Sequence, residues 1–338
     1  MNHVAIDLGG RESQICVRAP DGTILEEKRY ATRLLGKLMR GWTTSRVIVE
    51  TSAEAFRVAD AAKEAGHDVR VVPATLVKTL GVGARGIKTD QRDARTLSEV
   101  SCRIDLPSVH VPSEESRELK SMCGNRENLV ECRTKLVNNV RGWLRTQLWR
   151  TRSGSTSTMP TRIRESAKTN SRELPIHIEE TLELIAETTT RIRAADKRLR
   201  EFAKKHSVCV RLMTVPGVGP VTAVRFLAAL DDAARFRNAH AVQSYLGLTP
   251  GEHSSSDSQH RTSITKAGPA PLRRVLVQAA WTVLRTHPSD PMVLWAKKIE
   301  SRKHKFIAVV ALARKIAGIL FALWRDGTSY EPRRGAAM

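Results

Sequence analysis

The hydrophobic pattern of this 338-residue chain changes near residue 113, and this change constrains the fold more than any single motif. Before it, short apolar runs that end at turn residues alternate with amphipathic stretches that end at Gly or Pro. After it, apolar residues recur at helical spacing through most of the chain. The first pattern is typical of an α/β domain with a mixed sheet, and the second predicts packed helices.

The first domain is expected over residues 1–112, with its first three strands in the first 30 residues. The second and third of these strands flank Pro20-Asp21-Gly22, so they are predicted to form a hairpin. The later elements are expected as helices at 34–39, 53–65 and 88–100 and strands at 47–49 and 69–72.

A helical middle region is expected over residues 113–206. Val130, Val137 and Leu144 recur every seven residues, and a later series of the same spacing runs from Ile178 to Leu199. Heptad spacing predicts helices packed as in a coiled coil, either as an antiparallel pair or as an oligomer interface. Between them, residues 151–170 are rich in Ser, Thr and Arg, which predicts a flexible basic loop.

The chain carries a formal net charge of +21 and a pI of about 10.4. Such an excess favours a polyanionic partner, with nucleic acid first, over a merely basic soluble protein. Residues 133–172 contain ten Lys or Arg and a single acidic residue, Glu165. The residues of this stretch that we expect to bind phosphates are Arg133, Lys135, Arg141, Arg145, Arg150 and Arg152.

No membrane partner is expected, because the basic residues are spread along the chain and the most apolar stretch, 306–324, is interrupted by Arg314 and Lys315. That stretch predicts a packed helix. The five cysteines have neither Cys-x-x-Cys nor zinc-site spacing, which is typical of reduced thiols in a cytosolic protein. The start of the chain runs directly into a strand pattern, so no signal peptide is expected.

Four carboxylates stand out in the first domain. Asp7 and Glu50 each follow a predicted strand, and Asp90 and Asp93 share one face of a predicted helix at a spacing of three. Carboxylates gathered in one pocket favour a hard divalent cation, and two Mg²⁺ ions could clamp a phosphodiester during an in-line displacement. The alternative for each residue is an ordinary turn or helix-start position.

A second alternative is an ATP-dependent enzyme. Asp7 precedes Gly9-Gly10, as in the first phosphate motif of the actin and sugar-kinase fold. The adenosine loop of that fold is not evident in the sequence, and the basic charge does not suit a small-substrate kinase.

The C-terminal domain is expected over residues 207–330. Gly217 and Gly219 suit a helix-hairpin-helix whose free N–H groups meet a DNA phosphate, the alternative being a plain turn before a helix. Farther along, a run of serines at 254–256 precedes Lys266. A serine there is either a nucleophile supported by nearby cations or part of an ordinary loop.

Several motifs together resemble the insertion-sequence "one-ten" family of transposases, DEDD-type recombinases guided by a bridge RNA. The motifs that carry the resemblance are Ala5-Ile6-Asp7, Val49-Glu50-Thr51, residues 88–94, Val215-Pro216-Gly217-Val218-Gly219, Gly247-Leu248-Thr249-Pro250 and residues 264–268 leading to Leu272-Arg273-Arg274. The resemblance covers essentially the whole chain, and these motifs are specific for the family only when taken together.

The resemblance implies an RNase H-like (RuvC-like) N-terminal domain, a helical coiled-coil insertion and a mostly α C-terminal transposase domain. It implies that Asp7, Glu50, Asp90 and Asp93 bind the metal and that a serine becomes covalently linked to DNA. In the family this serine precedes a glycine. Here Ser255 takes the role, Ser254 and Ser256 are the alternatives in register, and Ser256 stands in place of the glycine.

The expected activity is therefore the cleavage and rejoining of donor and target DNA, with Mg²⁺ as the cofactor and a guide RNA as a partner. A homo-oligomer, a dimer or tetramer, is expected to bring the two sites together. The alternatives are a metal-dependent nuclease of the Holliday-junction type with an inert serine loop, and a nucleic-acid-binding protein without catalysis.

Overall fold

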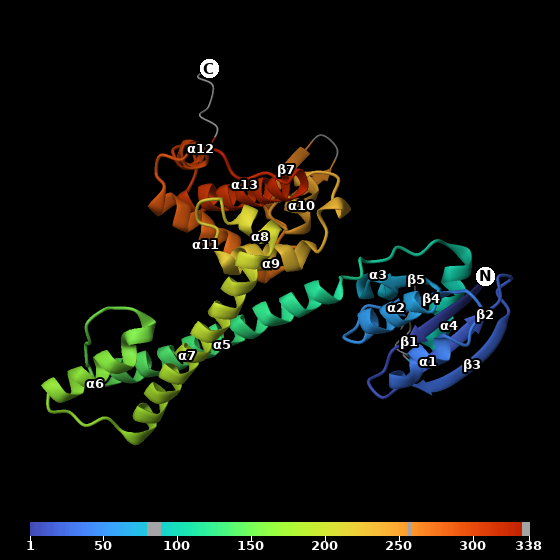
Figure 1. Cartoon of the computed structure of the whole chain (residues 1–338), viewed down its shortest axis with the longest axis horizontal. Helices are drawn as coiled ribbons and strands as arrows, with labels where there is room; N and C mark the ends of the chain where they lie inside the picture. Colours follow the sequence, from blue (N-terminus) through green and yellow to red (C-terminus); the bar gives the residue numbers. More distant parts are fainter. Residues whose placement is uncertain (80–88, 256–257, 333–338) are drawn as a thin grey trace, which may run out of the picture. The chain divides into compact units, whose positions relative to one another are not determined.

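The structure is a computed structural model that describes residues 1–79, 89–255 and 258–332, with side chains described for 1–77, 89–252 and 262–332. The chain forms two compact units, Met1–Pro112 (unit 1) and Ser113–Met338 (unit 2) (Figure 1). The boundary falls where the hydrophobic pattern changes. Unit 2 contains both the helical middle region and the C-terminal region.

Unit 1 is built on a five-stranded sheet in the order β3-β2-β1-β4-β5 (Figure 1). The strands are β1 (Asn2–Asp7), β2 (Glu12–Arg18), β3 (Ile24–Ala31), β4 (Ser45–Glu50) and β5 (Asp68–Val72). The first three form an antiparallel meander, β4 runs parallel to β1, and β5 runs parallel to β4. The predicted mixed sheet and its hairpin are confirmed.

Helices cover both faces of this sheet. On one face, η1 (Thr32–Leu34) leads into α1 (Leu35–Met39), which packs with α2 (Ala55–Glu64) over Ile6 and Val49. On the other, α3 (Ala74–Thr79) and α4 (Asp90–Arg103) enclose Ala5 and Ile48. Because successive strand residues point to opposite faces, each strand divides its side chains between the two cores.

Two long helices, α5 (Glu114–Thr146) and α7 (Ile176–Lys205), run antiparallel in unit 2. Leu119 near the start of α5 shares a core with Ala203 near the end of α7, while Val140 shares one with Leu182. Between them, Arg126 pairs with Asp196 at 2.9 Å. Of the two arrangements that the heptads allowed, the structure has the antiparallel pair within one chain.

The expectation of a flexible loop at 151–170 is wrong. The segment folds as η3 (Thr156–Thr158) and α6 (Met159–Thr169). Met159, Ile163 and Ala167 recur every four residues and are buried against the distal ends of α5 and α7. This narrow apolar stripe stabilises the helix despite the high Ser and Thr content, because an apolar face buried against other helices outweighs weak propensity.

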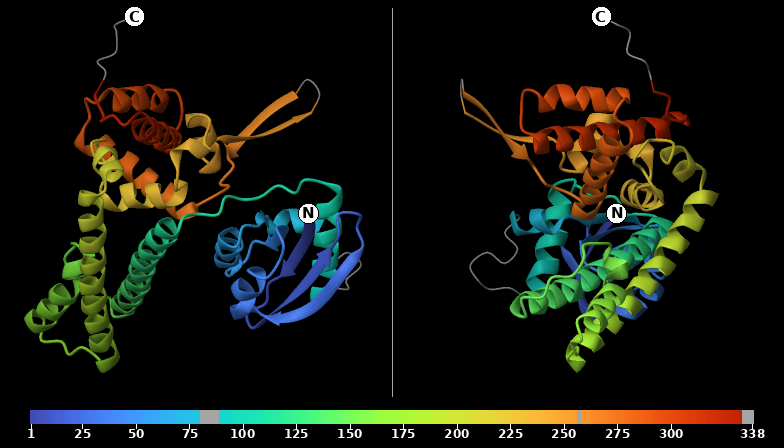
Figure 2. Two further views of the ribbon diagram at one scale, coloured as in Figure 1. Left: turned by 45° about the vertical axis from the view of Figure 1, so that its right-hand side comes forward. Right: turned by 90° about the vertical axis from the view of Figure 1, so that its left-hand side faces the viewer.

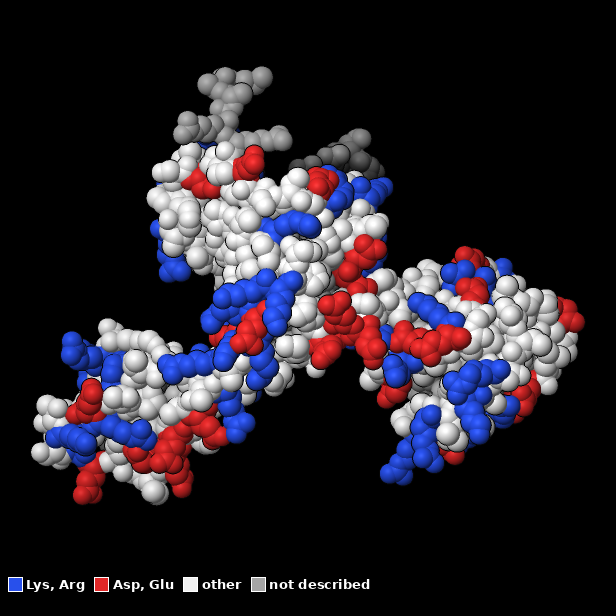
Figure 3. Space-filling model, in the orientation of Figure 1, with Lys and Arg blue, Asp and Glu red and all other residues white. Residues whose placement is uncertain are grey.

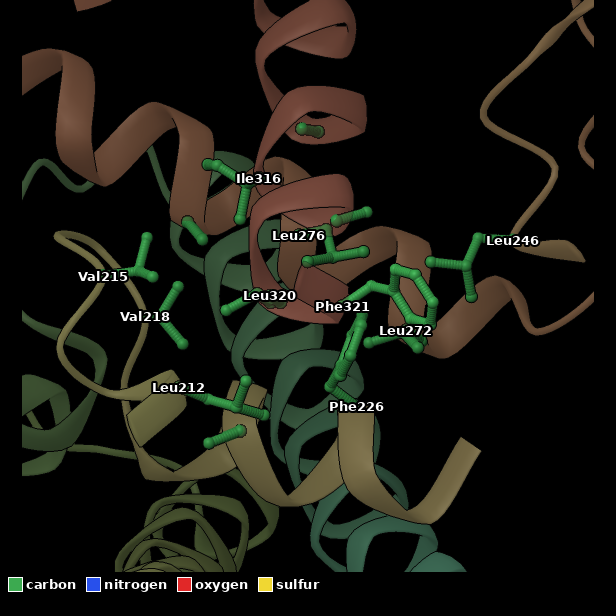
Figure 4. Packing of buried hydrophobic residues seen from close by; sticks show 14 of the residues in the cluster. Leu212, Val215, Val218, Phe226, Leu246, Leu272, Leu276, Ile316, Leu320 and Phe321 are labelled. Carbon is green, nitrogen blue, oxygen red and sulfur yellow. The ribbon is translucent and has the colours of Figure 1, made fainter. Parts of the chain in front are cut away.

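The rest of unit 2 is mostly helical, with one β-hairpin. Its elements are α8 (Ser207–Leu212), α9 (Pro220–Leu230), η4 (Ala233–Arg235), α10 (Ala239–Tyr245), β6 (Pro250–Ser255), β7 (Ser258–Ile264), α11 (Ala270–Thr286), α12 (Pro291–Glu300) and α13 (Lys305–Asp326). Figure 4 shows the core, where Phe226, Leu276 and Phe321 meet from α9, α11 and α13.

Helix α13 is long and apolar enough to cross a membrane, with a mean hydropathy of 2.2 over its most apolar window, half of which is buried. Its buried residues, among them Leu312, Ile316 and Leu320, belong to the core of unit 2. The packed helix that the sequence predicted at 306–324 is confirmed.

Candidate active site and nucleic-acid interface

Asp7 and Glu50 lie at the carboxyl ends of adjacent parallel strands. The register pairs Ile6 of β1 with Val49 of β4, so these two acidic residues follow one position later on neighbouring strands. Alternation places Asp7 on the face of Ala5, and Glu50 on the same face, which is the one that α4 covers. Both predicted carboxylates therefore lie at one edge and on one face of the sheet.

The first turn of α4 supplies the other two carboxylates. Thr89 caps the helix by accepting a hydrogen bond from the Arg92 N–H at 3.3 Å, which places Asp90 and Asp93 in the first turn. Asp90 is exposed, whereas Asp93 is 3% exposed. Leu97, one helical turn after Asp93, packs with Ala5 and Ile48, so this side of α4 faces the sheet.

A polar network fixes α4 on the sheet. Ser98 of α4 accepts a hydrogen bond from Arg18 Nε at 2.9 Å and lies 3.2 Å from the Cys16 sulfur, both on β2. Farther along the helix, Ser101 bonds His3 Nδ1 at 2.7 Å. Because these bonds reach strands β1 and β2, they hold the register of the helix and so the position of its acidic first turn.

The four residues have the chemistry of a divalent-metal site but are not gathered into one. Carboxylate oxygens are the ligands that Mg²⁺ prefers. Within the parts of the chain that the structure describes, no three acidic, histidine or cysteine side chains come close enough together to hold a metal ion. Asp7 and Glu50 share one end and one face of the sheet, and the first turn of α4, which carries Asp90 and Asp93, lies over that face.

Gly9 has a structural role beside Asp7. A Cβ at this position would lie 2.2 Å from the Glu12 carbonyl oxygen, so the tight turn from β1 to β2 requires glycine. Thr32 closes the same turn by donating its hydroxyl to the Gly9 carbonyl at 2.6 Å. The glycine motif that suggested a nucleotide-phosphate loop is thus accounted for by the turn itself.

Ser254 and Ser255 lie on a strand of a β-hairpin, whereas the sequence suggested an irregular polar loop. Strands β6 and β7 pair antiparallel from Pro250–Ile264 at the base to Ser255–Ser258 near the tip. Figure 2 shows the pair as a ribbon that projects from the helices of unit 2. The side chains of Ser254 and Ser255, and the whole of Ser256, lie outside the described residues.

The base of this hairpin is closed by two motifs that the sequence singled out. The Thr265 N–H donates to Thr249 at 2.9 Å, and the Lys266 N–H donates to Gly247 at 3.1 Å. Arg273 of α11 then donates to the carbonyls of Leu246, Ala267 and Gly268. Lys266 itself is exposed and adopts a positive φ of 57°.

The glycine turn before α9 packs against protein. Gly217 has a φ of +81°, and a Cβ there would lie 2.6 Å from the Ala279 carbonyl oxygen of α11. Gly219 is the N-cap residue of α9 and has open space around its Cα. Packing against α11 explains why residue 217 is glycine, and contact of either residue with a DNA phosphate stays a prediction.

The predicted phosphate-binding strip is mostly exposed. Lys135, Arg141, Arg145, Arg150 and Arg152 are exposed on α5 and just beyond it. Figure 3 shows Lys and Arg interspersed with Asp and Glu over helices α5, α6 and α7. Helix α7 contributes acidic partners: its Glu179, for example, pairs with Arg164 of α6.

Arg133 differs from the rest of that strip because it is partly buried, and its contact with a phosphate stays a prediction. It faces α7, where its guanidinium lies 3.4 Å from the Thr189 hydroxyl. Burial, and then the neighbouring Arg126, lower the pKa of Arg133. The sequence could not separate it from its exposed neighbours because its position on the inner face depends on α7.

Two family models match the chain over the regions just described. A transposase model of the DEDD type of IS110 elements matches residues 4–148, and a model described as "Transposase IS116/IS110/IS902 family" matches residues 209–292. A "Probable family 20 transposase" from Pseudomonas aeruginosa is 33% identical over 85% of this chain and 86% of its own length. The chain belongs to the IS110/IS116/IS902 family of transposases.

Further relatives agree with this assignment. A "Putative transposase y4pF/y4sB" from Sinorhizobium fredii is 28% identical over 95% of this chain and 83% of the relative. The "Transposase for insertion sequence element IS1111A" from Coxiella burnetii is 29% identical over 72% of this chain and 68% of the relative.

As a transposase, the protein is an enzyme that transfers DNA phosphodiester bonds. Its DEDD domain implies DNA cleavage and a divalent metal ion. The kinase-like alternative and the alternative of a binding protein without catalysis are therefore wrong.

Sequence reasoning missed one residue that supports the acidic helix of the transposase. Glu27 of β3 accepts hydrogen bonds from Arg95 Nε and Nη2, both at 2.5 Å, and from Gln91 at 3.3 Å. Both donors lie in the first two turns of α4. Only the fold reveals the contact, because Glu27 and α4 are more than sixty residues apart in the sequence.

The Glu27 contact predicts a pH dependence of stability. Hydrogen bonds from Arg95 hold the pKa of Glu27 below its ordinary value. Its stabilisation is therefore fully present above about pH 4.3, the pKa of an unfolded Glu, and is lost as pH falls through the lower folded value. We expect the melting temperature of the parent to fall below pH 4.3 more steeply than that of Glu27→Gln, in calorimetric scans between pH 3 and 7. Parallel curves would contradict the assigned contact.

Proposed function

We propose that this transposase cuts and rejoins DNA with two sets of residues, a carboxylate set in an RNase H-like (RuvC-like) unit 1 and a serine in unit 2. One observation carries the proposal. Asp7 and Glu50 end adjacent parallel strands on the face of the sheet that α4 covers with its buried Asp93. The strand order β3-β2-β1-β4-β5, with α4 packed on β1 and β2, supports the RNase H-like assignment.

Mg²⁺ is the proposed metal, and Asp7, Glu50, Asp90 and Asp93 are the residues that would hold it. When bound, an ion of this kind stabilises the negative charge that develops on phosphodiester oxygens. The contribution of the chain is placement, because the sheet fixes two carboxylates and the anchored helix α4 fixes the other two. Exposed Asp90 leaves one side of the set open to a DNA backbone.

Ser255 is the proposed nucleophile, with Ser254 and Ser256 as alternatives in register. Its hydroxyl oxygen forms a bond to phosphorus while the bond from phosphorus to a deoxyribose oxygen breaks. The serine proton passes to solvent, and the freed deoxyribose oxygen takes up a proton. Attack by the hydroxyl end of another strand then reverses the exchange, which releases the serine and joins the strands. Exposed Lys266, at the base of the hairpin, is a cation that can contact a phosphate of the bound strand away from the scissile position.

We also propose that the transposase acts as a homo-oligomer, a dimer or tetramer, on donor and target DNA in the cytoplasm, and that a guide RNA selects the sites. The domain limits that we propose are residues 1–112, 113–206 and 207–330. The exposed basic residues of α5 are the proposed phosphate contacts. The competing proposal is a metal-dependent nuclease of the Holliday-junction type in which the serine hairpin is inert.

Covalent trapping tests the proposal. The transposase is incubated with labelled donor and target DNA, the noncoding RNA that flanks its element and Mg²⁺, and a denaturing gel is searched for a protein–DNA adduct. We expect an adduct that Ser255→Ala and Asp7→Ala both abolish. Single alanine variants of Ser254 and Ser256 settle the register, and Asp21→Asn, in the exposed turn after β2, is the matched carboxylate control.

Either half of the proposal can fail separately. Free cleaved ends without an adduct, produced equally well by Ser255→Ala, would identify a metal-dependent nuclease. An adduct that survives Asp7→Ala would remove the carboxylates from the cleavage step and leave the serine assignment intact.

A further inference from the structure

An apolar groove runs beside the base of the serine hairpin, within unit 2. Its volume is about 810 Å³. One side is formed by residues at the hairpin base, including Pro250, Thr262 and Ile264. The other side comes from α12 and α13, which contribute apolar and basic residues: Trp295, Ile299, Phe306, Ile307, Arg314 and Lys315.

Two aromatic side chains of this groove are exposed to solvent. Trp295 is 37% exposed and Phe306 is 64% exposed. Their surroundings are cationic, since Lys315 Nζ lies 4.4 Å from the centre of the Trp295 ring. Phe306 lies edge-on to Trp281, with 6.0 Å between ring centres. Partly exposed aromatic side chains beside cations suit the stacking of flat rings better than the packing of an aliphatic side chain.

A basic corner borders the groove where α12 leads into α13. The corner consists of Lys297, Lys298, Arg302, Lys303 and Lys305, all exposed, and residues 297–305 include a single acidic residue, Glu300. Ile299, which lines the groove, lies within this stretch, and Phe306, which also lines it, follows the stretch directly. An aromatic-lined groove with a cationic rim is complementary to unpaired nucleotides, whose bases stack and whose phosphates carry the charge.

The hairpin connects this groove to the proposed nucleophile. Pro250 lies in the groove wall, and Ser255 lies five residues farther along β6. At a rise of about 3.4 Å per residue, that strand spans roughly 17 Å. A stacked nucleic-acid strand rises about 3.4 Å per nucleotide, so the same span corresponds to about five nucleotides. A strand joined to Ser255 could therefore reach the groove within a few nucleotides.

We propose that this groove binds unpaired nucleotides of the DNA strand that flanks the cleaved phosphate, with bases against Trp295 and Phe306 and phosphates on the basic corner. The location of the strand rests on the proposed role of Ser255, whereas the binding of unpaired DNA does not. The groove would hold the freed strand near the hairpin between cleavage and joining, which keeps the end from diffusing away.

Binding of a labelled 12-nucleotide single-stranded DNA to the full-length transposase, followed by fluorescence anisotropy, tests this site. Loss of one base–aromatic stack weakens binding by about 5- to 150-fold, so Trp295→Ala and Phe306→Ala should each fall in that range. Phe306→Tyr, which keeps the ring, should bind like the parent. Leu294→Ala is the matched control, because Leu294 is 48% exposed on the same helix as Trp295 but does not line the groove.

The salt dependence of the same binding experiment tests the basic corner. Replacing Arg302 and Lys303 by glutamine should reduce the slope of log affinity against log salt by about 0.7 for each DNA phosphate that is no longer neutralised. Ser255→Ala should retain full strand binding. If the covalent adduct fails to form but these bindings hold, the nucleophile assignment has failed and the groove assignment stands.

Three outcomes would overturn the groove assignment. One is unchanged DNA binding by both alanine variants with a normal melting temperature. Another is that the two alanine variants lose binding to an RNA strand of the same sequence but keep binding to the DNA strand, which would make RNA the ligand. A third is a self-associated parent that Phe306→Ala dissociates in sedimentation velocity runs, which would make the groove an interface between copies.

Discussion

Replacing Asp93 with asparagine should reduce strand cleavage by the transposase by about 10²- to 10⁴-fold, the range seen when an enzyme loses one group that acts on the reacting centre. The carboxylate is 3% exposed and lies on the side of α4 that faces Ala5 and Ile48. Asparagine fills nearly the same volume but lacks the charge that a divalent ion needs. Cleavage is measured with labelled donor DNA across a Mg²⁺ titration, and the remaining activity should require more Mg²⁺ than the parent does.

Glu99→Gln is the control for this prediction. It removes a carboxylate from the same helix, where Glu99 pairs with Arg103 at the surface and lies 3.9 Å from Arg18 Nη2, while the Arg18–Ser98 hydrogen bond that anchors α4 is kept. We expect its cleavage rate to stay within about twofold of the parent, because exposed ion pairs contribute little. Cleavage by Asp93→Asn within tenfold of the parent, with both variants melting normally, would assign Asp93 a purely structural role.

The positions of Asp7 and Glu50 in unit 1 could be predicted because the sequence patterns that reveal them are local. A strand that ends at Asp7 and another that ends at Glu50 are visible in the apolar runs before them. Alternation then assigns both side chains to one face. The burial of Asp93 could not be predicted, because it depends on where α4 crosses the sheet. The bonds that fix this crossing, from His3 and Arg18, reach about eighty to one hundred residues along the chain.

The serine hairpin, in contrast, could not be predicted from the sequence. A strand with one face on a core alternates apolar and polar residues, and that alternation is what reveals it. Strands β6 and β7 form a two-stranded ribbon that projects from the helices of unit 2 (Figure 2). Their sequence is mostly polar, lacks this alternation and reads as a loop. What marks the hairpin is its closed base, where the backbone of Gly247 lies against Ala267 and that of Gly268 lies against Tyr245.

Substituting Gly268 with alanine should destabilise unit 2 by about 3–5 kcal/mol, which corresponds to a fall of roughly 10 °C in melting temperature for a unit of this size. Two costs combine. Gly268 has a φ of +70°, and a Cβ there would lie 2.0 Å from the Tyr245 carbonyl oxygen. That oxygen belongs to backbone at the end of α10, so relief requires the base of the hairpin to shift.

Gly327→Ala separates these two costs. Gly327 has a φ of +69° at the end of α13, but a Cβ there would meet nothing within 4 Å. Its substitution should therefore lower the free energy of unfolding only by the cost of holding alanine at a positive φ, about 1–2 kcal/mol. Thermal unfolding of the two variants beside the parent measures the difference. Equal losses in both would mean that the hairpin base accommodates a methyl group freely. A larger loss in Gly268→Ala, together with a weaker covalent adduct, would mean that the contact between residues 245 and 268 sets the position of the serine hairpin.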